Sequence, residues 1–185
     1  MFTAQWLRLG GRVVHHLTRR YATSIQGSMM ITFEKLVKAH ESAILAIQLS
    51  ENHVKFASTP QAFLSDSTPQ IDKVVVRYKG EVVGFFKLDL NYSEYFDFCS
   101  GNALGFRTLA LDSRMQGKGL GTECMKQLAI YVERNYEMRD YIYLTVNCKN
   151  IGAKVCYEKA GFEDTGKLYL NGPAGPQHIM RRKVA

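Results

Sequence analysis

The chain has 185 residues, enough for one ordinary domain, and its 46% apolar and 22% charged residues are typical of a globular protein. No apolar run approaches the roughly 20 residues that cross a bilayer, and the four cysteines have neither C-x-x-C nor zinc-site spacing, so neither a membrane span nor a metal site is expected. The formal net charge of +7 is weak evidence for nucleic-acid binding, because four of the excess positive charges fall in the first 33 residues.

Residues 1–28 differ in composition from the rest, with four arginines, several serines and threonines and no acidic residue. Such a segment is typical of a mitochondrial transit peptide. An upstream extension before a natural start at Met29 or Met30 is the alternative that the sequence favours, and a third reading is a helix of the domain itself. On the first two readings a single domain spans 29–185, in the mitochondrial matrix or the cytoplasm, where the scattered cysteines would stay reduced.

The pattern of apolar residues becomes regular after Met30. Alternation predicts strands, helical spacing predicts helices, and Thr-Pro pairs are typical of helix starts. The expected elements are a strand over 31–37, a helix over 40–56, a short helix between Thr59-Pro60 and Thr68-Pro69, and a hairpin of 73–78 and 82–90 around the three-residue turn Lys79-Gly80-Glu81.

The second half continues the alternation of strands with helices. The expected elements are a strand over 103–111, a helix over 119–133, a strand over 141–146, a helix over 150–160 ended by Gly161, and a closing strand pair over 162–170 and 177–184. The whole order is β-α-α-β-β-β-α-β-α-β-β. It predicts an α/β fold with a mixed sheet and helices on both faces.

A glycine-rich turn, Gln116-Gly117-Lys118-Gly119-Leu120-Gly121-Thr122, follows the strand over 103–111 and opens the next helix. Glycines let backbone N–H groups approach a phosphate, and a helix N-terminus adds a partial positive charge. The turn has neither the Gly-Lys-Ser/Thr of the Walker loop nor the glycine spacing of the Rossmann fingerprint. It therefore predicts a phosphate site of another kind.

A second motif, N-I-G-A-K-V-C-Y-E-K-A-G-F, occupies 150–162. Its Asn150 and Tyr157 are seven residues apart and share one helix face. The Q-x-x-G-x-G turn and this block together resemble the pyrophosphate loop and the N-x-x-A-x-x-x-Y-E-K-x-G-F block of the GNAT superfamily of N-acetyltransferases. The specific resemblance covers 106–162 and a looser one runs from Met30 to the end. The G-F-R-T-L of 105–109 resembles the branch that includes bacterial spermidine and other polyamine acetyltransferases.

The resemblance implies a central splayed, mostly antiparallel sheet flanked by helices, with acetyl-CoA as cosubstrate and no metal. It implies direct transfer: the amine attacks the thioester, and a tetrahedral intermediate expels the coenzyme A thiolate, which Tyr157 protonates as general acid. The alternatives are that Tyr157 is a core residue, Asn150 a plain helix cap and Lys118 a solvated lysine. The implied cofactor-binding residues are Leu109, Leu111, Gln116, Gly117, Lys118, Gly119, Leu120, Gly121, Thr122 and Asn150.

The acceptor is expected to be a primary amine, on a small molecule such as a polyamine or on a peptide. Three acidic residues precede the strand over 103–111 and would face the acceptor: Asp89, Glu94 and Asp97. None of them is assigned as general base. If Glu94 and Asp97 line the site, cationic amines would be preferred. A coenzyme-A-binding module without turnover and an RNA-associated protein are the rival hypotheses. A homodimer is expected from the resemblance. Neither a nucleic acid nor a membrane is expected as a partner.

Overall fold

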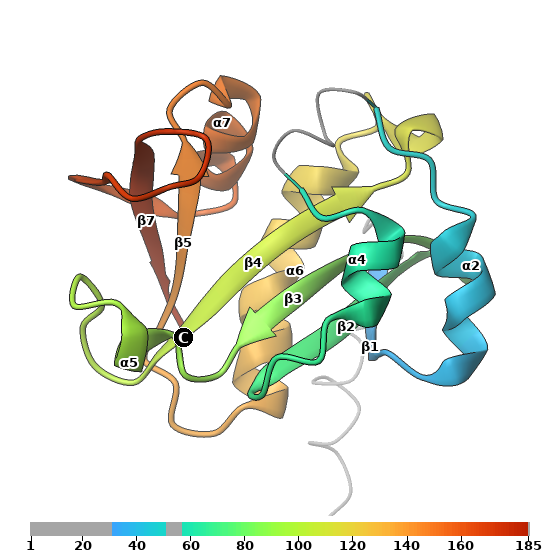
Figure 1. The fold of residues 1–185 in the computed structure, drawn as a ribbon, viewed down its shortest axis with the longest axis horizontal. Coiled ribbons are helices and arrows are strands. Elements are labelled where there is room, and N and C mark those ends of the chain that lie inside the picture. Colours follow the sequence, from blue (N-terminus) through green and yellow to red (C-terminus); the bar gives the residue numbers. More distant parts are fainter. Residues whose placement is uncertain (1–30, 51–56, 185) are drawn as a thin grey trace, which may run out of the picture.

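The computed structural model describes residues 31–50 and 57–184, so the segment 1–28 lies outside the described residues. The strands form one seven-stranded sheet in the order β1-β2-β3-β4-β5-β7-β6, in which only β4 and β5 are parallel (Figure 1). This confirms the mixed, mostly antiparallel sheet. The strands are β1 Ile31–Lys35, β2 Ile71–Tyr78, β3 Glu81–Asp89, β4 Ala103–Leu111, β5 Tyr141–Asn147, β6 Glu163–Tyr169 and β7 Gln177–Lys183.

Helices cover both faces of the sheet, as expected from the order of elements. In Figure 1, α4 lies in front of β2 and β3 and α6 lies behind them. The helix α2 lies to the right of α4 and packs on the same face, where Ile44 joins the cluster of Phe63 and Phe85. The helices are η1 Lys38–His40, α2 Glu41–Leu45, α4 Pro60–Ser65, α5 Tyr92–Tyr95, η2 Ser113–Met115, α6 Leu120–Asn135 and α7 Ile151–Lys159. The four-residue α5 lies in the aromatic stretch 92–98, where no helix is expected from the sequence.

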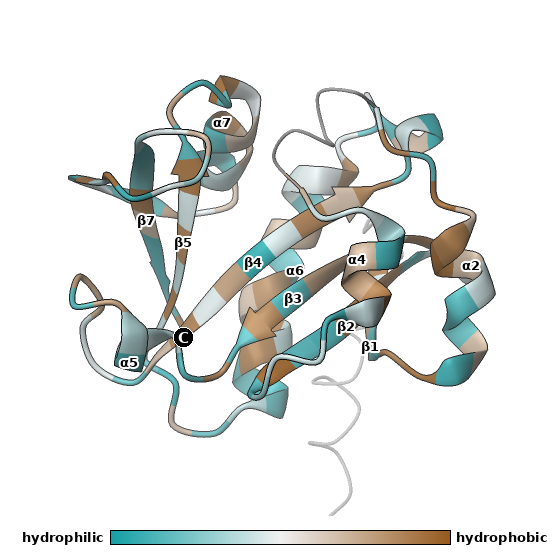
Figure 2. Ribbon diagram, viewed as in Figure 1, coloured by the Kyte–Doolittle hydropathy of each residue, from teal (hydrophilic) through white to brown (hydrophobic). Residues whose placement is uncertain are grey.

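Alternating side chains of β3 supply two cores, one on each face of the sheet. Phe86 and Leu88 pack into the cluster that includes the apolar residues of α6. Phe85 points to the other face and stacks on Phe63 of α4, with ring centroids 4.2 Å apart. Both faces are buried, so β3 is mostly apolar along its length, as the brown ribbon of Figure 2 shows.

The sheet divides between β4 and β5. Their pairing is confined to three residues, from Ala103 opposite Tyr141 to Gly105 opposite Tyr143. Beyond this point β4 remains paired with β3 and β5 with β7, and the two strands diverge in Figure 1. The expected splay is therefore present, and it leaves one edge of the second half of β4 without a partner strand.

A bulge in β4 accompanies the division. Phe85 lies opposite Ala110 but Lys87 lies opposite Arg107, so β4 has one residue more than β3 over this interval. Within the bulge Thr108 takes a φ of 56°, in the left-handed region that a β-branched residue rarely adopts. A bulge bends its strand and re-aims the neighbouring groups, which turns the end of β4 away from β5.

Two expected elements are wrong in extent. The helix over 40–56 ends at Leu45, because the carbonyl of Gln48 accepts a hydrogen bond from the N–H of Ser113 (2.7 Å) instead of continuing the helix; its last part, 51–56, lies outside the described residues. The hairpin turn consists of Lys79 and Gly80 alone. Both have positive φ, the conformation that matches the twist of the flanking strands.

Candidate active site

The glycine-rich loop lies between η2 and the start of α6, as the sequence predicts. Gly117 and Gly119 have φ values of 73° and 72°, so the loop needs glycine at both positions. The first N–H of α6 that bonds back is that of Glu123, to the carbonyl of Gly119 (3.1 Å). The N–H groups of Leu120 to Thr122 therefore have no carbonyl within the helix and form a positive end suited to an anion.

The side chains of this loop differ in exposure. Gln116, Gly117, Lys118 and Gly119 are exposed, whereas Leu120 is buried in the core and can offer a ligand only its backbone. The Nζ of Lys118 lies 3.4 Å from the Sδ of Met115.

Helix packing fixes the positions of Gly121 and Thr122. A Cβ on Gly121 would lie 3.4 Å from the Sγ of Cys156, at van der Waals distance, so α6 packs closely on α7 at this position. The hydroxyl of Thr122 donates to the same sulfur at 3.5 Å.

The loop is braced by the segment that follows α2. Asp112 is 3% exposed and accepts from the N–H (2.9 Å) and Nε (2.8 Å) of Arg114 and, at 3.5 Å, from the N–H of Gln48. The Arg114 side chain holds the pKa of Asp112 below its ordinary value, so the carboxylate stays ionised. The amide of Gln116 donates to the hydroxyl of Ser50 at 3.4 Å. These contacts hold the loop in one conformation before any ligand binds.

Leu109 and Leu111 lie in β4 beyond the last pair with β5. Their side chains are half-buried and pack against the core on the α6 side. Because β4 has no partner strand on this edge, its backbone N–H and C=O groups can pair with an extended ligand.

Tyr157 lies on α7 at the edge of the same core, near Phe106 and Phe162, with ring centroids 6.4 and 6.1 Å away. Burial raises the pKa of the Tyr157 hydroxyl above its ordinary value, so it stays protonated at neutral and mildly alkaline pH. Among the described residues it has no hydrogen-bond partner, and no fully buried side-chain polar atom lacks one. The hydroxyl therefore reaches an accessible surface.

Asn150 is the N-cap of α7. Its Oδ1 accepts a hydrogen bond from the N–H of Ala153 at 3.3 Å, as in the helix-cap reading of the sequence. The amide nitrogen of its side chain is not used by this cap. Capping and ligand binding are therefore compatible at Asn150.

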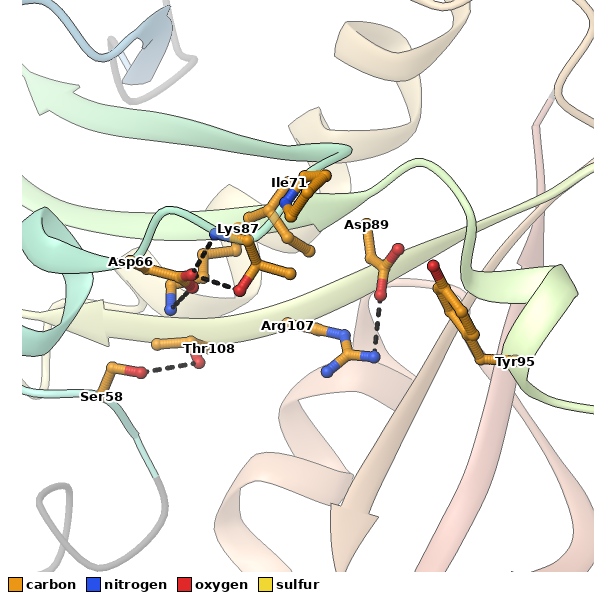
Figure 3. Close-up of a pocket in the computed structure, with 10 residues that line it drawn as sticks. Ser58, Asp66, Ile71, Lys87, Asp89, Tyr95, Arg107 and Thr108 are labelled. Atoms are coloured by element: carbon orange, nitrogen blue, oxygen red, sulfur yellow. Dashed lines mark hydrogen bonds and ion pairs between the residues drawn. The ribbon is translucent and has the colours of Figure 1, made fainter.

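A cavity of about 310 Å³ lies on the α4 face of the sheet beside the bulge in β4 (Figure 3). Two ion pairs line it: Lys87 Nζ lies 2.5 Å from the Oδ2 of Asp66, and Arg107 Nη2 lies 2.8 Å from the Oδ2 of Asp89. Thr108 and Tyr95 complete the wall that the strand and α5 provide. Four charged side chains thus meet in one cavity whose net charge is zero.

The cavity includes one of the three acidic residues considered from the sequence. Asp89 lines it, whereas Glu94 and Asp97 are not among its lining residues. Glu94 instead accepts from the side chain of Asn91 at 2.9 Å in an exposed position. Sequence reasoning missed Asp66 and Arg107, but Lys87, a cation inside the apolar run 82–88, is the signal that could have pointed here.

The comparisons with known proteins agree with this geometry. Residues 40–162 match the family described as Acetyltransferase (GNAT) family, which is more than half of the chain. The chain belongs to the GNAT acetyltransferase family.

Two relatives of this GNAT chain come from Bacillus subtilis strain 168. The spermine/spermidine N(1)-acetyltransferase is 29% identical over 146 residues, covering 78% of this chain and 95% of the relative. The uncharacterized N-acetyltransferase YbbJ is 31% identical over 144 residues, covering 76% and 89%. The chain is accordingly an acetyl-CoA-dependent N-acetyltransferase.

Solved structures share the fold of this acetyltransferase. The aminoglycoside acetyltransferase AAC(6')-Ib in complex with coenzyme A and kanamycin superposes with a TM-score of 0.66 at 19% identity, covering 83% of this chain and 94% of that one. The spermidine N-acetyltransferase of Vibrio cholerae in complex with coenzyme A and spermine gives 0.61 at 19% identity, covering 83% and 95%.

The described residues, 31–50 and 57–184, contain no group of three or more His, Cys, Asp or Glu side chains placed to hold a metal ion. None of their helices is long and apolar enough to cross a membrane.

Proposed function

We propose that this acetyltransferase moves the acetyl group directly from acetyl-CoA to a primary amine held in the cavity beside Thr108. The observation that carries the proposal is the form of β4. This strand loses its partner after Gly105, bulges at Thr108 and leads into the glycine loop. Tyr157 approaches the stretch from the α7 side, and the cavity opens on the α4 side. Donor and acceptor can therefore meet at β4 from opposite faces.

The cofactor is assigned to the residues expected from the sequence. The N–H groups of residues 116–122 would bind the pyrophosphate at the start of α6, with Lys118 as a mobile counter-charge. The backbone of Leu109 and Leu111 would pair with the pantetheine arm where β5 is absent. The side-chain amide of Asn150, left over from its cap, would donate to the same arm. Tyr157 would protonate the departing thiolate, because a phenol held neutral by burial is a proton donor at neutral pH.

The acceptor must lose a proton before it attacks, since an alkyl amine is mostly protonated at neutral pH. The carboxylates of the cavity are poorly suited to remove it. Lys87 and Thr68 lower the pKa of Asp66, and Asp89 is already paired with Arg107. No side chain is assigned as general base.

The acceptor class is proposed at two levels. A small-molecule amine fits the size of the cavity, and the names of relatives make a polyamine the first acceptor to test. The argument for cationic amines from Glu94 and Asp97 is not supported, because neither lines the cavity. We further propose a homodimer in a reducing compartment, the cytoplasm or the mitochondrial matrix, with neither nucleic acid nor membrane as a partner.

The test is release of free thiol from acetyl-CoA with a panel of polyamines, amino acids, aminoglycosides and lysine peptides. Turnover with one class, together with an acetylated product seen by mass spectrometry, supports the proposal and identifies the acceptor. Tight binding of coenzyme A without turnover on any amine would instead support a binding module.

A further inference from the structure

The guanidinium of Arg107 has donors that the protein does not use. Its Nη2 pairs with Asp89 at 2.8 Å, and its plane lies near the rings of Tyr92 and Phe96, 5.3 and 5.7 Å from their centroids. Among the described residues, Nε and Nη1 have no hydrogen-bond acceptor. The side chain is 42% exposed and lines the cavity, where Figure 3 shows it beside Asp89.

Each carboxylate oxygen of the cavity, by contrast, already has a partner in the protein. Asp66 accepts from the N–H of Thr68 (2.9 Å), its hydroxyl (2.6 Å) and Lys87 (2.5 Å). Asp89 is 3% exposed, accepts from the N–H of Asn91 (3.1 Å) and forms the ion pair with Arg107. A polycation entering the cavity would meet two resident cations and would have to displace one of them to reach a carboxylate.

The donors therefore favour a different acceptor. We propose that Arg107 selects acceptors that carry an anionic group beside the primary amine, a carboxylate or a phosphate. The anion would accept a hydrogen bond from Nε or Nη1, because hydrogen bonds between a charged guanidinium and an oxyanion are short and strong. The bulge residue Thr108 lines the same cavity, so there is room for the amine of the same molecule beside the bulge in β4.

The inference rests on the proposed function, since it names the acceptor of that reaction. The ion pair with Asp89 and the two aromatic contacts hold the stem of Arg107 in place without using Nε or Nη1. Arg107 would thus be a specificity-determining residue that is already oriented when the acceptor arrives. A purely structural ion pair would have no influence on which amines are acetylated.

The experiment compares acceptors that differ only in the anion. Thiol release is measured with ω-amino acids from glycine to aminocaproate, each against the n-alkylamine of equal length, with O-phosphoethanolamine against ethylamine, and with spermidine. We expect kcat/KM to be about 10- to 100-fold higher for the best anionic member than for its matched alkylamine, the range of one charged hydrogen-bonded contact. The carboxylate and phosphate arms show which oxyanion is preferred.

The variant Arg107→Gln should bring this ratio close to one by raising KM for the anionic acceptor. The double variant Asp89→Asn/Arg107→Gln serves the same purpose if the unpaired Asp89 prevents folding. Arg77→Gln is the matched control, because it removes another arginine–carboxylate pair, with Glu34, outside the cavity. It should leave the ratio unchanged.

Two results would contradict the inference without touching the proposed function: turnover of spermidine or alkylamines at least as efficient as that of every anionic acceptor, or a ratio that Arg107→Gln leaves intact. Absence of turnover with every amine would instead contradict the proposed function.

Discussion

At the scale of single residues, Tyr157 is the side chain on which the proposed chemistry depends most. Tyr157→Phe removes the proton donor but keeps the ring that packs against Phe106 and Phe162. We expect kcat to fall by about 10²- to 10⁴-fold, the usual contribution of a general acid, with little change in the Kd for acetyl-CoA. Thiol-release kinetics and calorimetric binding measure the two quantities separately.

The pH dependence provides a second check on Tyr157. Its pKa is raised by burial, so the neutral, proton-donating form persists above the pH at which an ordinary tyrosine ionises, about 10. If the rate of the wild-type enzyme declines at alkaline pH below about 10, the same decline should therefore be present in Tyr157→Phe. A decline that is absent in Tyr157→Phe would show that Tyr157 ionises earlier than its environment implies.

Asp66 supports the cavity and can be tested through stability. The Lys87 ammonium, helped by the hydroxyl of Thr68, lowers the pKa of Asp66, and the two ion-paired side chains are 18% and 10% exposed. A carboxyl group whose pKa is lowered by folding stabilises the folded state when the pH is above its ordinary pKa of about 4. This stabilisation is lost as the pH falls. Asp66→Asn should therefore reduce the free energy of unfolding by about 2 kcal/mol at pH 7.

Urea unfolding at neutral and acidic pH measures this effect. The difference between wild type and Asp66→Asn should shrink as the pH approaches about 3. Glu94→Gln is the control, since Glu94 is exposed and bonds only to the neighbouring Asn91 side chain; it should change stability by less than about 0.5 kcal/mol. An equal loss in both variants would show that the ion pair with Lys87 contributes nothing specific.

At the scale of elements, the loop before α6 combines backbone strain with ligand binding, and two glycines separate these effects. Gly117 and Gly80 both have positive φ, 73° and 86°, and a Cβ on either would meet no atom within 4 Å. Alanine at either position should cost about 1 to 2 kcal/mol of folding stability. At Gly117 the added methyl also lies in the loop that is proposed to bind the pyrophosphate.

We therefore expect Gly117→Ala to weaken acetyl-CoA binding by about tenfold or more, equivalent to about 1.4 kcal/mol, and Gly80→Ala, in the hairpin turn, to leave it unchanged. Calorimetric titration at a temperature where both variants are folded measures the difference. Equal affinities in the two variants would place the pyrophosphate elsewhere.

The sequence predicts the order of elements well because periodicity and glycine turns are local signals. The two motifs around Gly119 and Tyr157 lie where the sequence expects them. The cavity could not be predicted in the same way. The register of β3 with β4 places Lys87 opposite Arg107, and the packing of α4 on the sheet brings in Asp66, the residue that follows the helix. The early end of α2 likewise depends on a long-range bond from Ser113 to Gln48.

At the scale of the whole molecule, the divided sheet joins two halves that the proposed ligand would bridge. The half from β1 to β4 contributes the cavity and the glycine loop, and the half from β5 to β7 includes α7, which lies between β5 and β6 along the chain and carries Tyr157. Among the described strands, the three-residue pairing of β4 with β5 is the only strand pairing that joins the halves. Helix packing, such as that of Gly121 against Cys156, adds to this contact. A ligand in the split should therefore stabilise the fold as a unit.

This linkage gives a prediction for the chain that starts at Met30. Its described residues, from Ile31 to Val184, already supply three buried clusters, so removal of the preceding segment should leave the fold and the site intact. At 100 times its Kd, acetyl-CoA should add about 2.7 kcal/mol to the stability of either chain. For a protein of this size that corresponds to a rise in Tm of about 5 to 10 °C. Differential scanning fluorimetry of both chains, with acetyl-CoA and with desulfo-coenzyme A, measures it. A shortened chain that unfolds earlier, or that gains no Tm from the cofactor, would show that the first residues belong to the domain.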